Sequence, residues 1–521
     1  MATSNEQNDL SNEPKLLQLR RFLYLGDELN LLIKSVKYPF CPEKTQLLKD
    51  LDESNLGIEA LTEVARAHRN GNYLGFETLI HALVILGHSP NCSTKSKALK
   101  TACEICTSAS MMLTFAHFYK DISKPGKGWG RAHRKFLIKW YNEKEAKDLA
   151  VEVTKTKSCH NWTHKDVLCM AHVKAEHSGN AAVLKYLVKG LEVADKEYGS
   201  DPEAAPILNY LKGVYELCHT TDPETAARLI EVHNLCLEHI PSKLLKWNEV
   251  ALCIIPRLPL PNLLELLPQF DKVGLLKPDS PHLNAVLERL TSKDILENPP
   301  VGPLESFVAI RKLESEHKLM SDRISPVLED ALKNLHQASF KTVFSAEKRY
   351  LIALDINLAM IHGKCAGCNV LRPSHVSYII LMALLRAEFS NVDIVVFSTG
   401  DLVPVDINHE MSQIDITELL SDIPAGQVFL AAPLNWALKK KKRFDTFLVF
   451  SDCLSMIIVE QLELVFAEYK STMHLPNARY VLSTLCDRSS TFPFEDPYFL
   501  HLVGYNNKLL KIIQDYTSGV F

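Results

Sequence analysis

The sequence predicts two domains of different fold class: an all-α N-terminal domain of helical repeats and a C-terminal α/β domain with a doubly wound parallel sheet. Three observations support this prediction. The chain has only 20 glycines in 521 residues, below the usual share of about 7%. Apolar residues recur at helical spacing from about Leu16 to Gln337. From Arg349 onward, short β-branched runs alternate with helical segments.

The composition indicates a folded, soluble and intracellular protein. With 46% hydrophobic and 23% charged residues, the chain is too apolar to be disordered throughout. No window reaches ~18 consecutive apolar residues, so no membrane span is expected. Residues 1–15 are polar, which predicts a disordered N-terminus and excludes a secretory signal. The 13 cysteines are scattered and odd in number, which fits a reducing compartment.

The helical domain is expected over residues 16–345. Leu79, Ala82, Leu83 and Leu86 form one apolar helix face of many. Proline and glycine clusters interrupt the pattern at 123–128, 199–202, 256–261 and 299–300. There is no strict repeat period, but many antiparallel helix pairs of roughly 10–20 residues predict an α-solenoid of HEAT type.

The α/β domain is expected over residues 346–521. The predicted buried strands are Tyr350–Ile356, Val392–Ser398, Asp445–Ser451 and Arg479–Cys486. The predicted helices are Ser374–Glu388, Ile416–Ile423 and Met456–Ser471. Asp355 and Asp452 lie at the carboxyl ends of two strands, where doubly wound sheets bind ligands. A cation site is one interpretation of these acids, and simple helix capping is the alternative.

The near-neutral net charge of −4 argues at first against a nucleic-acid partner, but the charge is unevenly distributed. The segment 115–175 contains thirteen Lys and Arg and six Asp and Glu, a formal charge of +7 that leaves −11 for all other residues. Such an asymmetry indicates a binding site for a polyanion.

A helix in this segment concentrates the positive charge on one stripe. Arg131, Arg134, Lys135 and Lys139 follow the spacing i, i+3, i+4, i+8, while apolar and aromatic residues cover the other sides. Four cations on one stripe can follow a phosphate backbone. The alternative is an ordinary solvated helix face.

A second helix is predicted to start at Thr163, which begins a capping-box pattern. Its N-terminus could attract phosphate through free amides and the helix dipole. His164, Lys165 and His172 are expected on roughly one face of it. A structural histidine is the alternative interpretation, but the basic neighbours favour RNA contact.

These residues carry a resemblance to a known family. The runs WGRAHRKFLIKWYNEK (129–144), VTKTK (153–157) and NWTHKDVLCMAHVK (161–174) resemble the signature region of the Ro ribonucleoprotein family, whose helical module is called TROVE. The later runs RYLIALDINLAM (349–360), SDIPAG (421–426) and DTFLVFSD (445–452) resemble its von Willebrand factor A-like domain. The resemblance runs from about Leu17 to the end of the chain.

The resemblance implies a monomeric ring of HEAT-like repeats closed against the A-type domain. Family members bind small non-coding Y RNAs on the outer surface and the single-stranded ends of misfolded small RNAs in the central hole. It therefore implies RNA quality control within a small cytoplasmic ribonucleoprotein, with a nuclear fraction as a second expectation. No P-loop, GxSxG, HExxH or GxGxxG motif is present, so no catalysis is expected.

The resemblance also implies individual site residues. Lys155 and His172 match family positions that contact Y RNA, whereas a family arginine falls near Cys159-His160, which weakens or alters one contact. The candidate RNA-binding residues are Lys120, Arg131, Arg134, Lys135, Lys139, Lys155, Lys157, His164, Lys165 and His172.

The A-type domain departs from its family pattern at the metal-ion site. Asp355, Asn357 and Asp452 remain as a vestigial cation site, but Ala359 and Val428 stand where two ligands would supply oxygens. Magnesium demands oxygen ligands in octahedral geometry. We therefore expect weak or no Mg²⁺ binding and no cofactor.

Several other interpretations stay open. The alternative function is a protein-interaction scaffold that acts through its A-type domain. The pairs Cys103-x-x-Cys106 and Cys365-x-x-Cys368 lie too far apart in sequence to suggest one zinc module. The basic run Lys439–Arg443 is interpreted as a solvated loop, with an auxiliary RNA contact or a localisation signal as alternatives.

Overall fold

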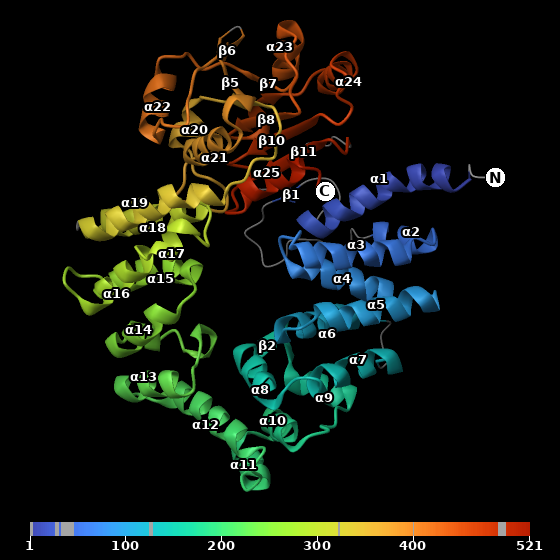
Figure 1. The fold of residues 1–521 in the computed structure, drawn as a ribbon, viewed down its shortest axis with the longest axis vertical. Helices are drawn as coiled ribbons and strands as arrows, with labels where there is room; N and C mark the ends of the chain where they lie inside the picture. The colour runs from blue at the N-terminus through green and yellow to red at the C-terminus, as the bar shows by residue number, and fades with distance from the viewer. Residues whose placement is uncertain are drawn as a thin grey trace. The chain divides into compact units, whose positions relative to one another are not determined.

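A computed structural model describes residues 4–26, 31–32, 46–123, 129–320, 324–399, 401–487 and 496–521. The chain divides into two compact units, whose elements are labelled in Figure 1. Unit 1 comprises Met1–Gly26 and Phe40–Leu258, and unit 2 comprises Asp27–Pro39 and Pro259–Phe521. The boundary precedes the change of sequence pattern at Arg349, because the helices after Leu258 pack with those of the α/β domain.

Unit 1 is helical, as the sequence predicts, and its described residues add a single short hairpin. The helices α2 to α6 form one packed group, in which α4 contacts α2, α3, α5 and α6 (Figure 1). The hairpin pairs β2 (Ser158–Cys159) with β3 (Trp162–Thr163). The helices are α1 (Ser4–Leu25), α2 (Gln46–Glu53), α3 (Gly57–Asn70), α4 (Phe76–Gly87), α5 (Cys92–Ile105), α6 (Ala109–Ile122), α7 (Arg131–Asn142), α8 (Ala146–Lys155), α9 (His164–Ala171), α10 (Ser178–Lys189), α11 (Leu191–Tyr198), α12 (Ala205–His219), α13 (Pro223–Val232) and α14 (Asn248–Ile254).

Helix α1 differs from the prediction of a disordered N-terminus over residues 1–15. The helix begins at Ser4 and continues to Leu25. Its C-terminal part packs through Leu19, Phe22 and Leu23, which are buried. Because helix propagation costs less than nucleation, this packed part can extend into the polar residues before it. Composition alone misses such an extension.

Local caps fix where the helices of unit 1 begin. The Asn91 side chain accepts from Ser93 N at the start of α5 (3.0 Å), and the Ser108 hydroxyl accepts from Met111 N at the start of α6 (3.3 Å). The Glu152 carboxylate of α8 also accepts from Ala109 N, at 2.8 Å. These caps satisfy amides that would otherwise lack partners and tie α8 to the start of α6.

From Pro259 onward, unit 2 begins with helices α15 to α19, which are followed by a mainly parallel sheet whose strands alternate with helices α20 to α25. The first five helices are α15 (Leu260–Lys272), α16 (Pro281–Leu290), α17 (Lys293–Glu297), α18 (Pro303–Met320) and α19 (Pro326–Ser339). The later helices are α20 (Leu358–His362), α21 (Pro373–Glu388), α22 (Gln413–Ser421), α23 (Ala432–Lys440), α24 (Leu462–Thr472) and α25 (Leu509–Thr517).

The main sheet has seven strands in the order β1-β11-β10-β8-β4-β5-β6. All neighbouring pairs are parallel except β5 and β6. The strands are β1 (Leu31–Leu32), β4 (Tyr350–Leu354), β5 (Val392–Phe397), β6 (Leu402–Pro404), β8 (Thr446–Ser451), β10 (Arg479–Thr484) and β11 (Phe499–Val503). Two further short strands, β7 (Val428–Phe429) and β9 (Ile457–Ile458), pair with each other.

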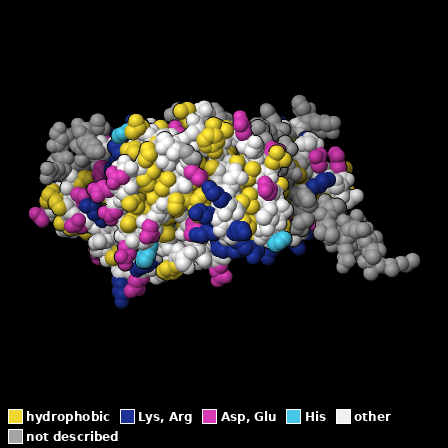
Figure 2. Space-filling model, turned by 90° about the horizontal axis from the view of Figure 1, so that it is seen from above, with side chains coloured by type: hydrophobic (Ala, Val, Ile, Leu, Met, Phe, Trp, Pro, Cys, Tyr) yellow, Lys and Arg dark blue, Asp and Glu magenta, His cyan; other side chains and the backbone are white. Residues whose placement is uncertain are grey.

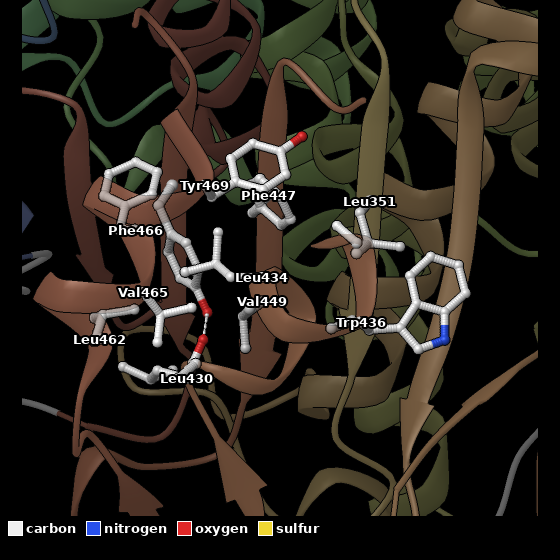
Figure 3. Packing of buried hydrophobic residues seen from close by; sticks show 14 of the residues in the cluster. Leu351, Leu430, Leu434, Trp436, Phe447, Val449, Leu462, Val465, Phe466 and Tyr469 are labelled. Carbon is white, nitrogen blue, oxygen red and sulfur yellow. Dashed lines mark hydrogen bonds between the residues drawn. The ribbon is translucent and has the colours of Figure 1, made fainter. Parts of the chain in front are cut away.

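One face of this sheet is covered by α23 and α24. Trp436 of α23 and Phe466 of α24 belong to a buried cluster with Phe447 and Val449 of β8, all shown in Figure 3. Burying each large apolar side chain contributes about 1.5–3 kcal/mol. The central strands therefore read as continuous apolar runs, because both of their faces are covered.

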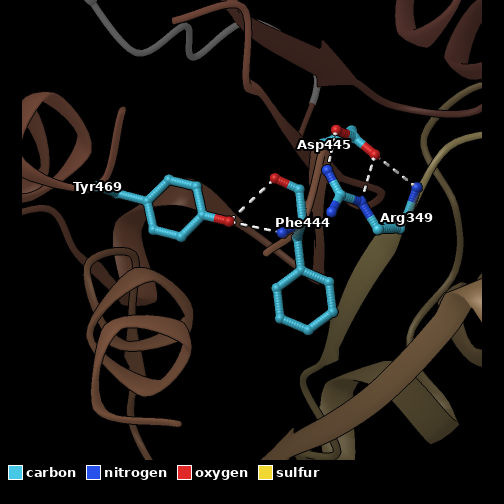
Figure 4. Close-up of polar contacts among 4 residues, drawn as sticks. All are labelled: Arg349, Phe444, Asp445 and Tyr469. Atoms are coloured by element: carbon cyan, nitrogen blue, oxygen red, sulfur yellow. Dashed lines mark hydrogen bonds and ion pairs between the residues drawn. The ribbon is translucent and has the colours of Figure 1, made fainter. Parts of the chain in front are cut away.

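An ion pair joins the beginnings of β4 and β8. The Arg349 guanidinium donates to both carboxylate oxygens of Asp445, at 2.9 and 2.7 Å, and Arg349 N donates to the same carboxylate at 2.9 Å (Figure 4). The Tyr469 hydroxyl donates to Phe444 O at 3.0 Å and accepts from Phe444 N at 2.6 Å. The residues before β8 are thus held from both sides.

The structure confirms the fold class, with a helical part followed by an α/β domain. The four predicted strands occur as β4, β5, β8 and β10. The predicted helix Met456–Ser471 begins later, at Leu462, because Ile457 and Ile458 pair with β7 instead. No helix among the described residues is long and apolar enough to cross a membrane. The ring form implied by the family resemblance stays a prediction.

Candidate nucleic-acid interface

The basic stripe lies on α7, as the sequence predicts. Arg131, Lys135 and Lys139 are exposed, and Arg134 is half-buried. Lys139 forms an exposed ion pair with Glu143, whose carboxylate is 3.2 Å away. Such a surface pair contributes little, so Lys139 remains available for a phosphate. The Arg134 Nε is buried without a hydrogen-bond partner in the described part of the chain.

The opposite side of α7 anchors the stripe. Phe136, Leu137, Trp140 and Tyr141 are buried. The Trp140 indole N–H donates to Cys106 O at 2.8 Å. Because the anchored side cannot turn outward, the cations of α7 face solvent in a fixed register.

Helix α9 starts with the predicted capping box. Thr163 Oγ1 accepts from Asp166 N at 3.3 Å, and the Asp166 carboxylate accepts from Thr163 N at 2.9 Å. The helix begins where the sequence predicts it to begin. However, the carboxylate of Asp166 already occupies this N-terminus, which makes it a poorer site for a second anion.

His164 is buried and does not contact solvent, contrary to its prediction as an RNA-binding residue. Its side chain is 1% exposed. Its Nδ1 lies 2.8 Å from the Tyr141 hydroxyl, and its Nε2 lies 2.9 Å from Thr156 O. Burial lowers the pKa of His164 to about 4, so the ring is neutral at pH 7. His164 therefore joins α7, α8 and α9 and belongs to the support of the interface.

The expected common face of His164, Lys165 and His172 does not include His164, which is buried. Helix α9 ends at Ala171, and His172 is its C-cap in the left-handed conformation (φ 55°). Lys165 and His172 are both exposed, but His172 lies just after the last residue of the helix. A capping pattern in the sequence predicts where this helix begins and gives no sign of where it ends.

The cations after α8 lie near unit 1's 3₁₀ turn Leu237–His239. Lys155 is half-buried, and its charge contributes to lowering the pKa values of Glu238 and His239. Lys157 is exposed, and its Nζ lies 3.8 Å from Cys218 Sγ of α12. Lys120, at the end of α6, is exposed. Lys124 and Lys127, which count toward the charge of the segment, lie outside the described residues.

Cys159, near which the family pattern has an arginine, faces α6. Cys159 Sγ lies 3.6 Å from Thr114 Oγ1 and 3.9 Å from Ser110 Oγ. The thiol is half-buried and carries no positive charge. The Cys159 side chain therefore cannot make the charged phosphate contact that an arginine would make at this position.

Sequence reasoning missed an aromatic contact beside the basic segment. Trp129 and Trp162 stack with ring centroids 5.6 Å apart, and Trp162 is half-buried. It also missed that Lys144 is committed to the fold, since its Nζ donates to Thr107 O at 2.7 Å and lies over the Trp140 ring. Spacing in the sequence carries no signal for either contact.

The vestigial cation site of unit 2 contains an amide where a metal would need acceptors. Asn357 Nδ2 donates to Asp355 Oδ2 and to Asp452 Oδ1, each at 2.9 Å. The Ser451 hydroxyl donates to Asp355 Oδ2 at 2.8 Å. No group of three or more His, Cys, Asp and Glu among the described residues could hold a metal ion. These residues do not fit a magnesium site.

A second basic surface belongs to unit 2. The run Lys439–Arg443 ends α23 and is exposed, with Lys442 paired to Asp393 at 2.6 Å. Figure 2 shows Lys and Arg side chains gathered near the middle of the face seen there. The run provides exposed cations that are separate from those of unit 1.

Comparison with known proteins identifies two domain families. Residues 97–352 match the TROVE domain, and residues 349–517 match the Ro60 vWA domain. The chain belongs to the Ro family. It is 26% identical over 444 residues to the RNA-binding protein RO60 of Deinococcus radiodurans, covering 84% of this chain and 80% of the relative. It is 21% identical to the RNA-binding protein RO60 of Caenorhabditis elegans, covering 96% and 88%.

A solved structure supports the Ro fold over almost the whole chain. The crystal structure of the Deinococcus radiodurans Ro (RSR) protein matches with a TM-score of 0.84 at 23% identity, covering 97% of this chain and 100% of that one. At this identity, the likeness establishes the fold alone. The order of a TROVE domain followed by a Ro vWA domain agrees with the domain order predicted from the sequence.

Proposed function

We propose that this Ro-family protein binds RNA through the basic surface of unit 1 and has no catalytic activity. The proposal rests on the basic stripe of α7, in which Arg131, Lys135 and Lys139 are exposed and Arg134 is half-buried, while the opposite side of the helix is buried. Arginine offers paired donors to phosphate oxygens, and phosphate contacts dominate nucleic-acid affinity. Lys155, Lys157, Lys165 and the exposed His172 extend the surface.

The expected partners are small structured non-coding RNAs. Proteins read such RNAs mainly by shape, through phosphate and 2′-hydroxyl contacts and through unpaired ends. The family resemblance supports Y-type RNAs and the 3′ ends of misfolded RNAs as ligands, and RNA quality control as the role. We place the protein in the cytoplasm, with a nuclear fraction, as a monomer that needs no cofactor. Cross-linking in cells followed by sequencing of bound RNA tests the choice of ligand.

The first prediction concerns the stripe. Replacing Arg131, Arg134 and Lys135 together by Glu should weaken binding of a small hairpin RNA by about a hundredfold or more. Hydrogen bonds to charged groups contribute roughly 1.5–3 kcal/mol each, and reversed charges also repel the phosphates. Filter binding measures the affinity, and circular dichroism confirms that the variant is folded.

The matched control is the triple variant Lys439→Glu, Lys440→Glu and Lys441→Glu. It changes the net charge by the same amount, at three exposed positions of unit 2. We expect it to retain most of the RNA affinity. Equal losses in both triple variants would show that total charge, rather than the α7 stripe, determines binding. Unchanged affinity of the α7 variant would remove the site assignment and favour the scaffold alternative.

A further inference from the structure

Helix α12 presents an exposed aromatic pair that the RNA surface described above does not use. Tyr215 is 48% exposed, and its ring centroid lies 4.2 Å from that of His219, with 32° between the ring planes. His219 is exposed too, and its Nδ1 lies 2.7 Å from Tyr215 O. Residues four apart share one helix face. The two rings therefore form a single fixed surface that is open to solvent.

A cation from outside α12 contacts Cys218, the residue that precedes His219. Cys218 lies on the same face of α12, and Lys157 Nζ is 3.8 Å from its sulfur. Tyr186 of α10 lies on another side, where burial and the nearby Cys218 and Tyr215 raise its pKa. Its hydroxyl is therefore neutral at pH 7. The surface combines ring faces, a neutral hydroxyl and an ammonium group.

The charges around the aromatic pair leave Lys157 available. Lys212 of α12 pairs with Asp195 at 2.8 Å, and Lys185 of α10 pairs with Glu197 at 2.7 Å. None of the ion pairs found among the described residues involves Lys157. Glu216 of α12 is exposed nearby in sequence, so the surface is mixed in charge rather than strongly basic. A surface with one available cation can bind a single phosphate, whereas a long duplex backbone requires several cations.

We propose that Tyr215, His219 and Lys157 form a stacking subsite for one unpaired nucleotide of a bound RNA. The base would stack on the exposed rings, and its phosphate would contact the Lys157 ammonium group. Single-strand binding proteins combine these two elements, because every base has a stacking face and every nucleotide carries a phosphate. The proposal rests on RNA binding by unit 1 and adds a preference for single-stranded segments at α12.

The test compares two RNAs, a hairpin with an unpaired oligouridine tail and the same hairpin with a blunt end. Tyr215→Ala should weaken binding of the tailed RNA by about tenfold, because stacking of one base is lost, and should change blunt-hairpin binding less than twofold. Tyr215→Phe keeps the ring and should retain the affinity for the tail. Since Tyr215 is half exposed, neither variant should unfold the protein, which thermal melting checks.

A control and two outcomes separate this subsite from the wider proposal. Val232→Ala removes an apolar side chain that is 69% exposed on α13, and it should change neither affinity. If Tyr215→Ala binds the tailed RNA as the wild type does, or loses both RNAs equally, the subsite is wrong while RNA binding stands. If the wild type binds neither RNA, both proposals are wrong.

Discussion

At the scale of single residues, Asn357 determines what the strand ends of unit 2 can bind. Its amide N–H groups contact two carboxylates, and its oxygen accepts from Met360 N at 3.0 Å to cap α20. Burial raises the pKa of Asp355, although the Asn357 and Ser451 donors oppose that shift. The amide thus donates hydrogen bonds to both carboxylates. In a metal site, a bound cation would instead neutralise their negative charge.

Replacing Asn357 by Asp tests this interpretation. The new carboxylate would face Asp355 and Asp452 without a donor, so the variant should be less stable by about 1–3 kcal/mol. It could still cap α20. With three carboxylates and the Ser451 hydroxyl in one place, millimolar Mg²⁺ or Mn²⁺ should restore much of that stability. Thermal melting with and without the metals gives the measurement.

The wild type is the control for this variant, and its melting temperature should not depend on either metal. A wild-type melting temperature that rises with Mg²⁺ as much as that of Asn357→Asp would contradict the role assigned to the amide. It would also reopen the cation-dependent scaffold alternative.

At the scale of elements, the contact between Arg349 and Asp445 sets where two central strands begin. Burial alone would raise the pKa of Asp445, but the hydrogen bonds and charge of Arg349 outweigh it and hold the pKa below its usual value. A carboxylate with a depressed pKa stabilises the fold above its unfolded pKa of about 4. That contribution is lost as the pH falls from about 4 through the folded pKa.

The variant Asp445→Asn measures this contribution. At pH 7 it should be less stable than the wild type, because Arg349 loses its charged partner. The difference should shrink steadily as the pH falls below about 4, where the wild-type carboxylate becomes protonated. Urea unfolding at several pH values gives the two free energies. A difference that stays constant with pH would show that packing, not charge, causes the loss.

The sequence predicts elements well where one local pattern is sufficient. Strands β4 and β8 are continuous apolar runs, and both of their faces are buried. Strand β11 is harder to predict, because His501 interrupts its apolar run, and its Nε2 lies 2.8 Å from the Thr484 hydroxyl of β10. Strand β1 has two residues and pairs with that distant strand. Such long-range contacts leave no periodic signal.

In the candidate site, too, the sequence predicts local patterns but not long-range contacts. The stripe on α7 and the cap at Thr163 are local patterns, and the structure contains both. The burial of His164 depends on Tyr141 and Thr156, which belong to two other elements. A histidine beside lysines has the same sequence pattern whether its ring faces solvent or the core. Tertiary packing decides between these two positions, and spacing cannot.

At the scale of the whole molecule, the distribution of charge matters more than its sum. The net charge of −4 combines +7 in one segment of unit 1 with −11 elsewhere. An acidic remainder repels phosphate and restricts non-specific RNA contact. The charge pattern therefore favours one RNA surface, and it predicts a strong dependence of binding on salt.

The salt dependence gives a quantitative test of a single phosphate contact. If Lys135 neutralises one phosphate, Lys135→Ala should make the slope of log affinity against log salt less negative by about 0.7–0.9. Lys439→Ala, in unit 2, should leave the slope unchanged. Filter binding over a salt series gives both slopes. Identical slopes for wild type and Lys135→Ala would remove Lys135 from the interface.

The pairing of β1 with β11 also affects the order in which the protein can fold during synthesis. Leu31 and Leu32 leave the ribosome long before their partners Leu502 and Val503, which lie far along the chain. Domains usually fold as they emerge, from the N-terminus onward, but this sheet edge must wait until Leu502 and Val503 have been made. A fragment that starts at residue 346 would lack β1 and expose β11 as an open edge prone to aggregation.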